Sequence, residues 1–214
     1  MRDAAESAIR KSRVVSYLRL IESELQAFSL QLLDAEKLAL ATYCAELSRW
    51  NEKINLTALS GGSLVRRLVV EPVWIARELQ PGGTLVDIGS GNGSPAIPFR
   101  IICPFRRCDL IEVRAKRAAF LRHLAATLKL QNVVVHRARF EQVGAALGSP
   151  PDWISLQAVH LNETLVDAIR RICSLTTSIV WITSRGVRSG LRPVRTLTVP
   201  ITGTQVLLFQ LDLS

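Results

Sequence analysis

The segment LVDIGSGNG, residues 85–93, constrains the fold of this chain most, because an apolar run leads directly into a turn with glycine at every second position. The apolar run has the content of a buried parallel strand. Gly89, Gly91 and Gly93 have no β-carbon, so backbone N–H groups in the turn can approach a ligand closely. A helix is predicted to follow from Pro95, where a missing N–H costs little. Strand, glycine turn and helix together predict a nucleotide-cofactor site.

Two cofactor classes compete for this turn. A dinucleotide site uses G-x-G-x-x-G/A, whereas the register here gives Gly89, Gly91 and then Ser94. Asp87 precedes the first glycine, and a carboxylate there suits the sulfonium and amino groups of S-adenosylmethionine better than an anionic pyrophosphate. Glu112, at the end of the next predicted strand, suits the ribose of either cofactor. The pattern favours S-adenosylmethionine over NAD; a tight turn without a ligand is the third alternative.

Composition excludes several other classes of protein. The 214 residues are 48% apolar, which is ample for a core. The four cysteines show no C-x-x-C spacing and the three histidines stand apart, so we expect neither a disulfide framework nor a metal site. The N-terminus lacks an apolar signal core, and no run approaches the roughly 18 apolar residues of a membrane span. We therefore expect a cytoplasmic protein with no membrane partner.

The net charge of +9 is distributed unevenly. Residues 1–83 are nearly neutral, whereas residues 100–139 carry ten lysines and arginines against two acids. A second basic cluster has no acid within it and consists of Arg185, Arg188, Arg192 and Arg195. Such clusters can be solvated helix faces, but arginine-rich patches on a neutral background favour recognition of phosphate, and hence nucleic acid.

The chain changes its organisation once, at Pro81-Gly82-Gly83. Helical periodicity predicts a helical N-terminal extension over 1–83, with its second helix at 34–50 and its third at 63–79. Strands then alternate with helices through the domain at 84–214. The predicted strands are 84–88, 107–112, 132–136, 152–157 and 177–183, and a closing hairpin is predicted at 194–199 and 205–211. This alternation predicts an α/β fold: a mostly parallel, doubly wound sheet with an antiparallel C-terminal edge.

Four segments carry a family resemblance: RWNEKINLTAL (49–59), LVDIGSGNGSPAIP (85–98), EVRAKRAAFLRHL (112–124) and LKLQNVVVHRARFE (128–141). Together they resemble the bacterial small-subunit ribosomal RNA methyltransferase family called RsmG or GidB. The W-N-x-x-x-N-L-T piece is the most specific, because generic methyltransferases lack it. The resemblance implies a Rossmann-like class I methyltransferase domain. It also implies transfer of the methyl group of S-adenosylmethionine to N7 of a guanine in 16S rRNA.

The resemblance also implies the site residues, with the main chain of Ser94 at the cofactor, Glu112 on the ribose, and Phe140 and Glu141 along the adenine. The predicted cofactor-binding residues are Asp87, Gly89, Gly91, Gly93, Ser94, Glu112, Phe140 and Glu141. Arginine can read N7 and O6 of guanine together, and the arginines predicted to bind RNA are Arg66, Arg67, Arg185 and Arg188. No catalytic acid or base is expected, because guanine N7 carries an exposed lone pair and needs only alignment with the methyl group.

Several positions depart from the family's pattern. Leu156 stands where the family has an arginine after the fourth strand, and leucine cannot replace arginine in contacts to phosphate or cofactor. A methyltransferase acting on another RNA or a small molecule, and a non-catalytic RNA-binding relative, therefore stay open as alternatives. The predicted partner is ribosomal RNA or the small ribosomal subunit, and the protein is expected to be a monomer.

Overall fold

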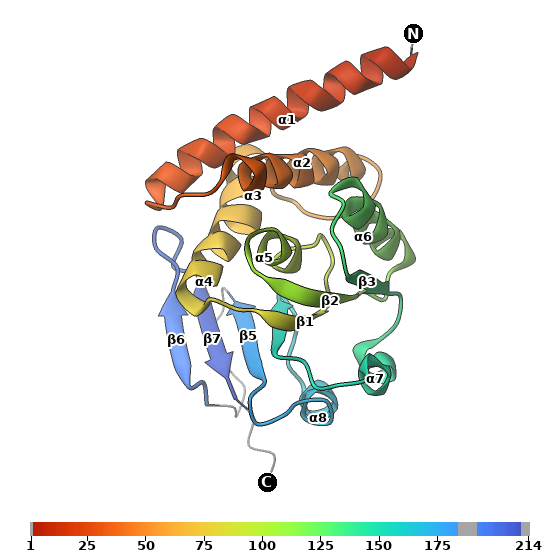
Figure 1. Cartoon of the computed structure of the whole chain (residues 1–214), viewed down its shortest axis with the longest axis vertical. Helices are drawn as coiled ribbons and strands as arrows, with labels where there is room; N and C mark the ends of the chain where they lie inside the picture. Colours follow the sequence, from red (N-terminus) through yellow and green to blue (C-terminus); the bar gives the residue numbers. More distant parts are fainter. Residues whose placement is uncertain (1, 184–191, 211–214) are drawn as a thin grey trace.

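The computed structural model describes residues 2–183 and 192–210, which form a central sheet with helices on both faces (Figure 1). The strands are β1 (Gly83–Ile88), β2 (Phe105–Ile111), β3 (Val133–His136), β4 (Trp153–Gln157), β5 (Ser178–Thr183), β6 (Arg195–Thr198) and β7 (Gln205–Phe209). Their order across the sheet is β3-β2-β1-β4-β5-β7-β6. The first five strands pair in parallel, and β7 is antiparallel to both neighbours. The predicted doubly wound sheet with an antiparallel edge is confirmed.

The helices occupy the connections that the alternating pattern predicts. They are α1 (Arg2–Ala27), α2 (Asp34–Asn51), α3 (Gly61–Val65), α4 (Glu71–Leu79), α5 (Ala96–Ile102), α6 (Ala115–Thr127), α7 (Phe140–Val143) and α8 (Glu163–Arg170). A 3₁₀ turn, Gly144–Leu147, extends α7. The short connections place each crossover helix on the sheet, as parallel pairing requires.

The third predicted helix differs from the structure in its interior. It is divided into α3, a π-helical turn over Arg66–Val70, and α4. Pro72 lies in the first turn of α4; it has no N–H, and a proline ring displaces the carbonyl four residues before it. The Glu71 N–H bonds to the Arg66 carbonyl, five residues earlier. The helix therefore widens before the proline and continues in a new register.

Two apolar cores lie on the two faces of the sheet. The first joins α1, α2 and α6 to the sheet through residues such as Ile21, Tyr43, Phe120 and Leu85. The second lies under α7 and α8 and includes Phe140. The first core contains residues from both sides of position 83, so the helical extension packs as part of the same body. The division of the chain into two domains at 83/84 stays a prediction.

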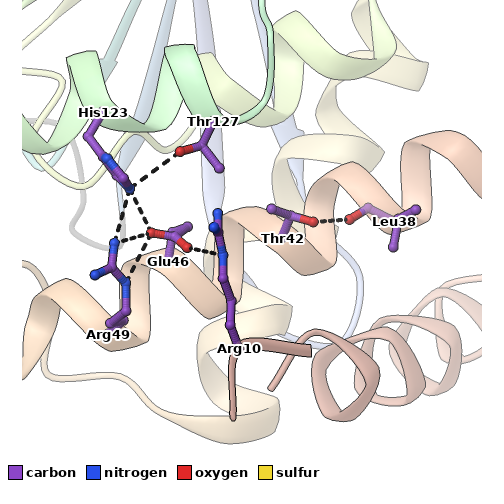
Figure 2. A network of polar contacts seen from close by, with 7 residues as sticks. All are labelled: Arg10, Leu38, Thr42, Glu46, Arg49, His123 and Thr127. Carbon is purple, nitrogen blue, oxygen red and sulfur yellow. Dashed lines mark hydrogen bonds and ion pairs between the residues drawn. The ribbon is translucent and has the colours of Figure 1, made fainter. Parts of the chain in front are cut away.

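A polar network ties α1, α2 and α6 together around one buried side chain, Glu46 (Figure 2). Its Oε1 lies 2.8 Å from Arg10 Nε of α1. Its Oε2 lies 2.6 Å from Arg49 Nη2 and 2.7 Å from His123 Nε2 of α6. The indole ring of Trp50 packs against the imidazole of His123, with their centroids 5.3 Å apart. One carboxylate thereby holds three helices at the end of the molecule that α1 crosses (Figure 1).

Within the described residues, no helix is long and apolar enough to cross a membrane. The same residues contain no cluster of three or more histidine, cysteine, aspartate or glutamate side chains that could hold a metal ion.

Candidate cofactor site

The glycine turn begins directly after β1, at the point where the strand order reverses between β2 and β4. Ligands of open α/β sheets bind at such a switch point, beyond the carboxyl ends of the strands. The N–H groups of Gly89 and Ser90 both bond to the Ile111 carbonyl at the end of β2, at 2.9 and 3.0 Å. These bonds fix the turn against the neighbouring strand.

All three glycines of the turn adopt the left-handed region, with φ of +74° at Gly89, +48° at Gly91 and +93° at Gly93. A β-carbon on Gly93 would lie only 2.9 Å from Ile97 Cγ1, and one on Gly89 would lie 2.9 Å from Val159 Cγ2. A β-carbon on Gly91 would meet nothing closer than 3.6 Å. Gly91 is therefore required by its backbone conformation alone, whereas the other two are also required by packing.

Asp87 is buried in β1 at 1% exposure. Its Oδ1 accepts a 2.6 Å hydrogen bond from Ser155 Oγ of β4, the residue opposite it in the sheet. Its Oδ2 is buried and accepts no hydrogen bond from any residue that the structure describes. Burial raises the pKa of this carboxyl to about 6, although the hydrogen bond from Ser155 acts in the opposite direction. Asp87 therefore presents one unsatisfied anionic oxygen just before the glycine turn.

Glu112 is buried beyond the end of β2 and connects the turn to α6. Its Oε2 accepts a 3.0 Å hydrogen bond from the Gly91 N–H, and its Oε1 accepts a 2.7 Å bond from the Arg114 N–H. Each carboxylate oxygen can accept a further bond. The structure thus brings the predicted ribose ligand against the predicted turn.

The other predicted cofactor residues lie around the same end of the sheet. The Ser94 N–H bonds to Asn92 Oδ1 at 3.0 Å, and its buried hydroxyl has no partner among the described residues. Phe140 begins α7 beyond β3 and is 3% exposed within the second core, whereas Glu141 is exposed to solvent. Their roles toward the cofactor stay predictions.

Side chains that sequence reasoning did not single out support the turn. The Tyr43 hydroxyl of α2 donates to the Asn92 carbonyl at 3.1 Å. Arg117 of α6 donates to the Asn55 carbonyl at 2.9 Å, and its Nη1 would lie 3.6 Å from a β-carbon on Gly91. Arg117 therefore joins the loop of the W-N-x-x-x-N-L-T segment to the glycine turn. In the sequence, the one signal for this contact is the W-N-x-x-x-N-L-T motif, which contains Asn55.

Within that segment, Asn51 organises the loop. Its Oδ1 accepts bonds from the N–H groups of Leu56 and Thr57 at 2.8 and 3.0 Å, and its Nδ2 donates to the Thr57 carbonyl at 2.9 Å. An amide is suited to this position because it both donates and accepts. Asn51 thus closes the loop that the W-N-x-x-x-N-L-T motif forms.

The predicted fourth strand, 152–157, is found at Trp153–Gln157 and contains Leu156, the position where the family has an arginine. Leu156 lies inside β4, opposite Ile88 and Trp181, and is fully buried in the second core. The strand ends at Gln157, which is half-buried. An apolar residue suits this buried position in the second core. Gln157 is the residue at the carboxyl end of β4, where a ligand contact would be made.

The arginines predicted to bind RNA have different environments. Arg66 makes two hydrogen bonds to Glu24 of α1, at 2.7 and 2.9 Å. Arg67 pairs with Glu71 at 2.8 Å and also bonds to Thr204 near the final hairpin. Both guanidinium groups thus already bind carboxylates of the same chain. Arg185 and Arg188, the other two predicted RNA ligands, lie outside the described residues.

The sheet order, the glycine turn at the switch point and the acid at the end of β2 define a Rossmann-like class I methyltransferase domain. Among solved structures, a mutant of MtNAS in complex with S-adenosylmethionine has a TM-score of 0.58 at 15% identity, over 90% of this chain and 84% of that one. MtNAS in complex with MTA and tNA gives a TM-score of 0.57 at 15% identity, over 83% and 73%. At this identity the likeness shows the fold.

Sequence comparison gives the family. The profile of rRNA small subunit methyltransferase G matches residues 36–190. The ribosomal RNA small subunit methyltransferase G of Wolinella succinogenes is 32% identical over 161 residues, 75% of this chain and 82% of that protein. The protein of that name from Chloroflexus aggregans is 37% identical over 153 residues, 70% of this chain and 64% of its own length. The chain belongs to the rRNA small subunit methyltransferase G family, which confirms the family predicted from the sequence.

Proposed function

We propose that this protein is an S-adenosylmethionine-dependent methyltransferase that modifies N7 of a guanine in 16S rRNA of the small ribosomal subunit. Family membership supports the reaction class. The observation that carries the cofactor assignment is the unsatisfied Oδ2 of Asp87, because a buried carboxylate without a partner suits a cationic ligand. The proposal includes the predicted setting, a monomer acting in the cytoplasm.

The residues present fit the cofactor. Asp87 offers an anionic oxygen for its positive groups, and the left-handed glycines leave room for backbone groups to approach it. Glu112 retains acceptor capacity beside the turn for ribose hydroxyls. Gln157, at the end of β4 across the switch point, is a further candidate for contact with the cofactor or the base.

The reaction needs alignment more than acid–base chemistry. S-adenosylmethionine supplies an electrophilic methyl carbon on a sulfonium. The lone pair of guanine N7 forms the new N–C bond as the S–C bond breaks, and the electron pair of that bond stays on sulfur. The protein has to hold N7, the carbon and sulfur in line and exclude water. A looped or unpaired guanine suits this role, since the deep major groove of duplex RNA hides N7.

The test is methyl transfer to isolated small subunits with S-adenosylmethionine carrying a labelled methyl group. We expect 7-methylguanosine in the digested rRNA, with incorporation strongly reduced in the Asp87→Asn variant. Label on another base or another guanine atom would contradict the assigned substrate. No transfer to the subunit or to its free rRNA would contradict the proposed function itself.

A further inference from the structure

A run of 28 residues, Val113–Phe140, contains seven lysines and arginines and no aspartate or glutamate. It builds α6 and the edge strand β3, which lie side by side along one side of the molecule (Figure 1). The nearest acids in the sequence are Glu112, which is buried beneath the glycine turn, and Glu141 on α7. The surface contributed by this stretch of the chain therefore carries cations and no carboxylate.

This surface gathers several cations that have no partner within the described part of the chain. Many arginines elsewhere make close ion pairs with acids of the same chain, as Arg13 does with Glu52 and Arg66 with Glu24, and the unpaired cations Lys11, Arg19 and Arg171 are more widely separated in the sequence. On this surface the side chains of Lys116 on α6, Lys129 just after it, and Arg137 and Arg139 beyond β3 are exposed. They bind no other group in the described part of the chain. Their full charge is directed to solvent.

The shape of the surface fits an extended polyanion. A groove between α6 and β3 carries two cations, Arg122 and Lys129. The rest of its lining is Ala125, Ala126, Leu130, Gln131, Val133, Val134 and Val135. Arg122 donates to the outward Val135 carbonyl at 3.1 Å, so it covers the sheet edge against pairing with another strand. Ala125 and Ala126 lie between Arg122 and Lys129 in the sequence, and their small side chains leave room on the groove floor for a sugar–phosphate backbone. Because the edge is covered, a charged partner suits the groove better than an added β-strand.

The α6/β3 surface beyond the groove extends to the carboxyl end of the sheet, where the glycine turn lies. Ile111 and His136 are neighbours in the sheet, so the chain beyond β2 and the chain beyond β3 emerge together. Arg114 and Arg137 each follow within three residues of these strand ends. Phosphates bound along α6 and β3 would therefore lead toward the glycine turn.

We infer that the α6/β3 surface, defined by Lys116, Arg122, Lys129, Arg137 and Arg139, is the docking surface for the rRNA sugar–phosphate backbone. The inference rests on the proposed function and specifies where its substrate binds. It replaces Arg66 and Arg67, whose charges are already paired within the chain, as the principal phosphate ligands.

The test compares two triple variants that each remove three unpaired, exposed cations. Lys116→Gln/Lys129→Gln/Arg137→Gln alters the surface, and Lys11→Gln/Arg19→Gln/Arg171→Gln is the matched control elsewhere. Affinity for protein-free small-subunit rRNA and for small subunits is measured over a range of KCl concentrations. Melting temperature and S-adenosylmethionine affinity, measured alongside, should match wild type in both variants.

We expect the surface variant to lose on the order of tenfold in rRNA affinity at moderate salt, and the magnitude of its log–log salt slope to fall by about 2. The control should keep the affinity of wild type within about twofold. Equal losses in the two variants, or wild-type affinity in the surface variant, would overturn the inference. A loss for subunits alone would indicate a ribosomal protein as partner and would also overturn it.

Methyl transfer by wild type separates the two proposals. If wild type methylates the subunit but the surface variant binds rRNA normally, the docking surface is wrong and the proposed function stands. If wild type neither binds nor methylates rRNA or subunit, the proposed function is wrong and the inference falls with it.

Discussion

Two buried carboxylates, Glu46 and Asp87, have opposite electrostatic environments. Glu46 lies among Arg10, Arg49 and His123 (Figure 2). Burial alone would raise its pKa, but the hydrogen bonds from Arg49 and His123 and the charges of the two arginines outweigh burial and lower it. Asp87 receives one neutral hydroxyl, so burial dominates and its pKa rises to about 6. Both side chains are 1% exposed, so partners rather than burial make the difference.

The comparison separates a structural charge from a functional one. The chain supplies cations for Glu46, and that carboxylate stabilises the junction of three helices. It supplies none for Asp87, and an ionised carboxylate left in that state opposes folding. A buried carboxylate that destabilises the free protein has a functional explanation if a bound ligand supplies the missing cation. We therefore interpret the end of β1 as a site prepared for a cation.

The largest effect on cofactor binding is expected from Asp87→Asn. Loss of the charge should weaken S-adenosylmethionine binding by about 30-fold or more, the value of a charged hydrogen bond of roughly 2 kcal/mol. The free variant should be at least as stable as wild type at neutral pH. A carboxyl with a raised pKa stabilises the fold most below its unfolded value near 3.8, and that stabilisation is lost as pH rises through about 6.

Calorimetric titration and thermal melting check both expectations. Asp109→Asn is the control, because Asp109 is buried on β2 but paired with Arg107 at 2.7 Å and His136 at 2.7 Å. It should lower the melting temperature and leave cofactor affinity unchanged. Equal affinity in Asp87→Asn and wild type would remove the functional role of Asp87.

The largest effect on stability is expected at the end of β4. Leu156→Arg places a charge in the second core and should lower the free energy of unfolding by about 4 kcal/mol or more. Gln157→Arg, one residue later and half-buried, should change it by less than about 1 kcal/mol. Urea unfolding of the two variants measures this. Similar stabilities would show that β4 ends before Leu156.

At the other carboxylate, Glu46→Gln should lower the free energy of unfolding by about 2–3 kcal/mol, because it leaves three cationic or polar partners around a neutral amide. Cofactor affinity should stay the same. The pKa of Glu46 is lowered, so its stabilisation is present above the unfolded pKa near 4.5 and is lost as pH falls through the lower folded value. The difference between variant and wild type should therefore vanish in acid.

Glu22→Gln provides the matched control for Glu46→Gln in urea unfolding. Glu22 is half-exposed and lies 3.7 Å from Lys37, so its removal should change stability by no more than about 0.5 kcal/mol. A lower cofactor affinity in Glu46→Gln would contradict the assignment of a structural role to Glu46 and a functional role to Asp87.

A smaller effect is expected at Gly91. Gly91→Ala meets no close neighbour but keeps a left-handed backbone, which costs an L-residue about 1–2 kcal/mol. Gly62→Ala, in a helix and with its nearest atom at 3.6 Å, should be neutral or slightly stabilising. Chemical denaturation compares them. Equal stability of the two variants would mean that the turn relaxes around Gly91.

Local patterns predicted the fold well. Every strand expected from apolar runs was found within three residues of its predicted bounds, because strand content and turn residues are read from neighbouring positions. The glycine turn and Glu112 were predicted for the same reason. The widened helix at Arg66–Val70 was not, although Pro72 was visible, since periodicity does not record how a proline is accommodated.

Contacts between distant positions could not be read from the sequence. The partners of Glu46 come from residues 10, 49 and 123, and the pairing of Arg66 with Glu24 spans 42 residues. A basic residue in the sequence therefore predicts an RNA ligand only after its internal partners are known. The environment of Leu156 also depends on the pairing register, which places it between Ile88 and Trp181.

The role of Asp87 toward the cofactor is tested by the affinity for S-adenosylmethionine between pH 7 and pH 5. The sulfonium is permanently charged and the amino group stays protonated in this range, so the titrating partner is Asp87, with its pKa of about 6. We predict that wild-type affinity falls about tenfold from pH 7 to pH 5 as the carboxylate gains a proton, and that Asp87→Asn binds weakly and equally at both values. A wild-type affinity independent of pH across this range would contradict the contact between the Asp87 carboxylate and the positive groups of the cofactor.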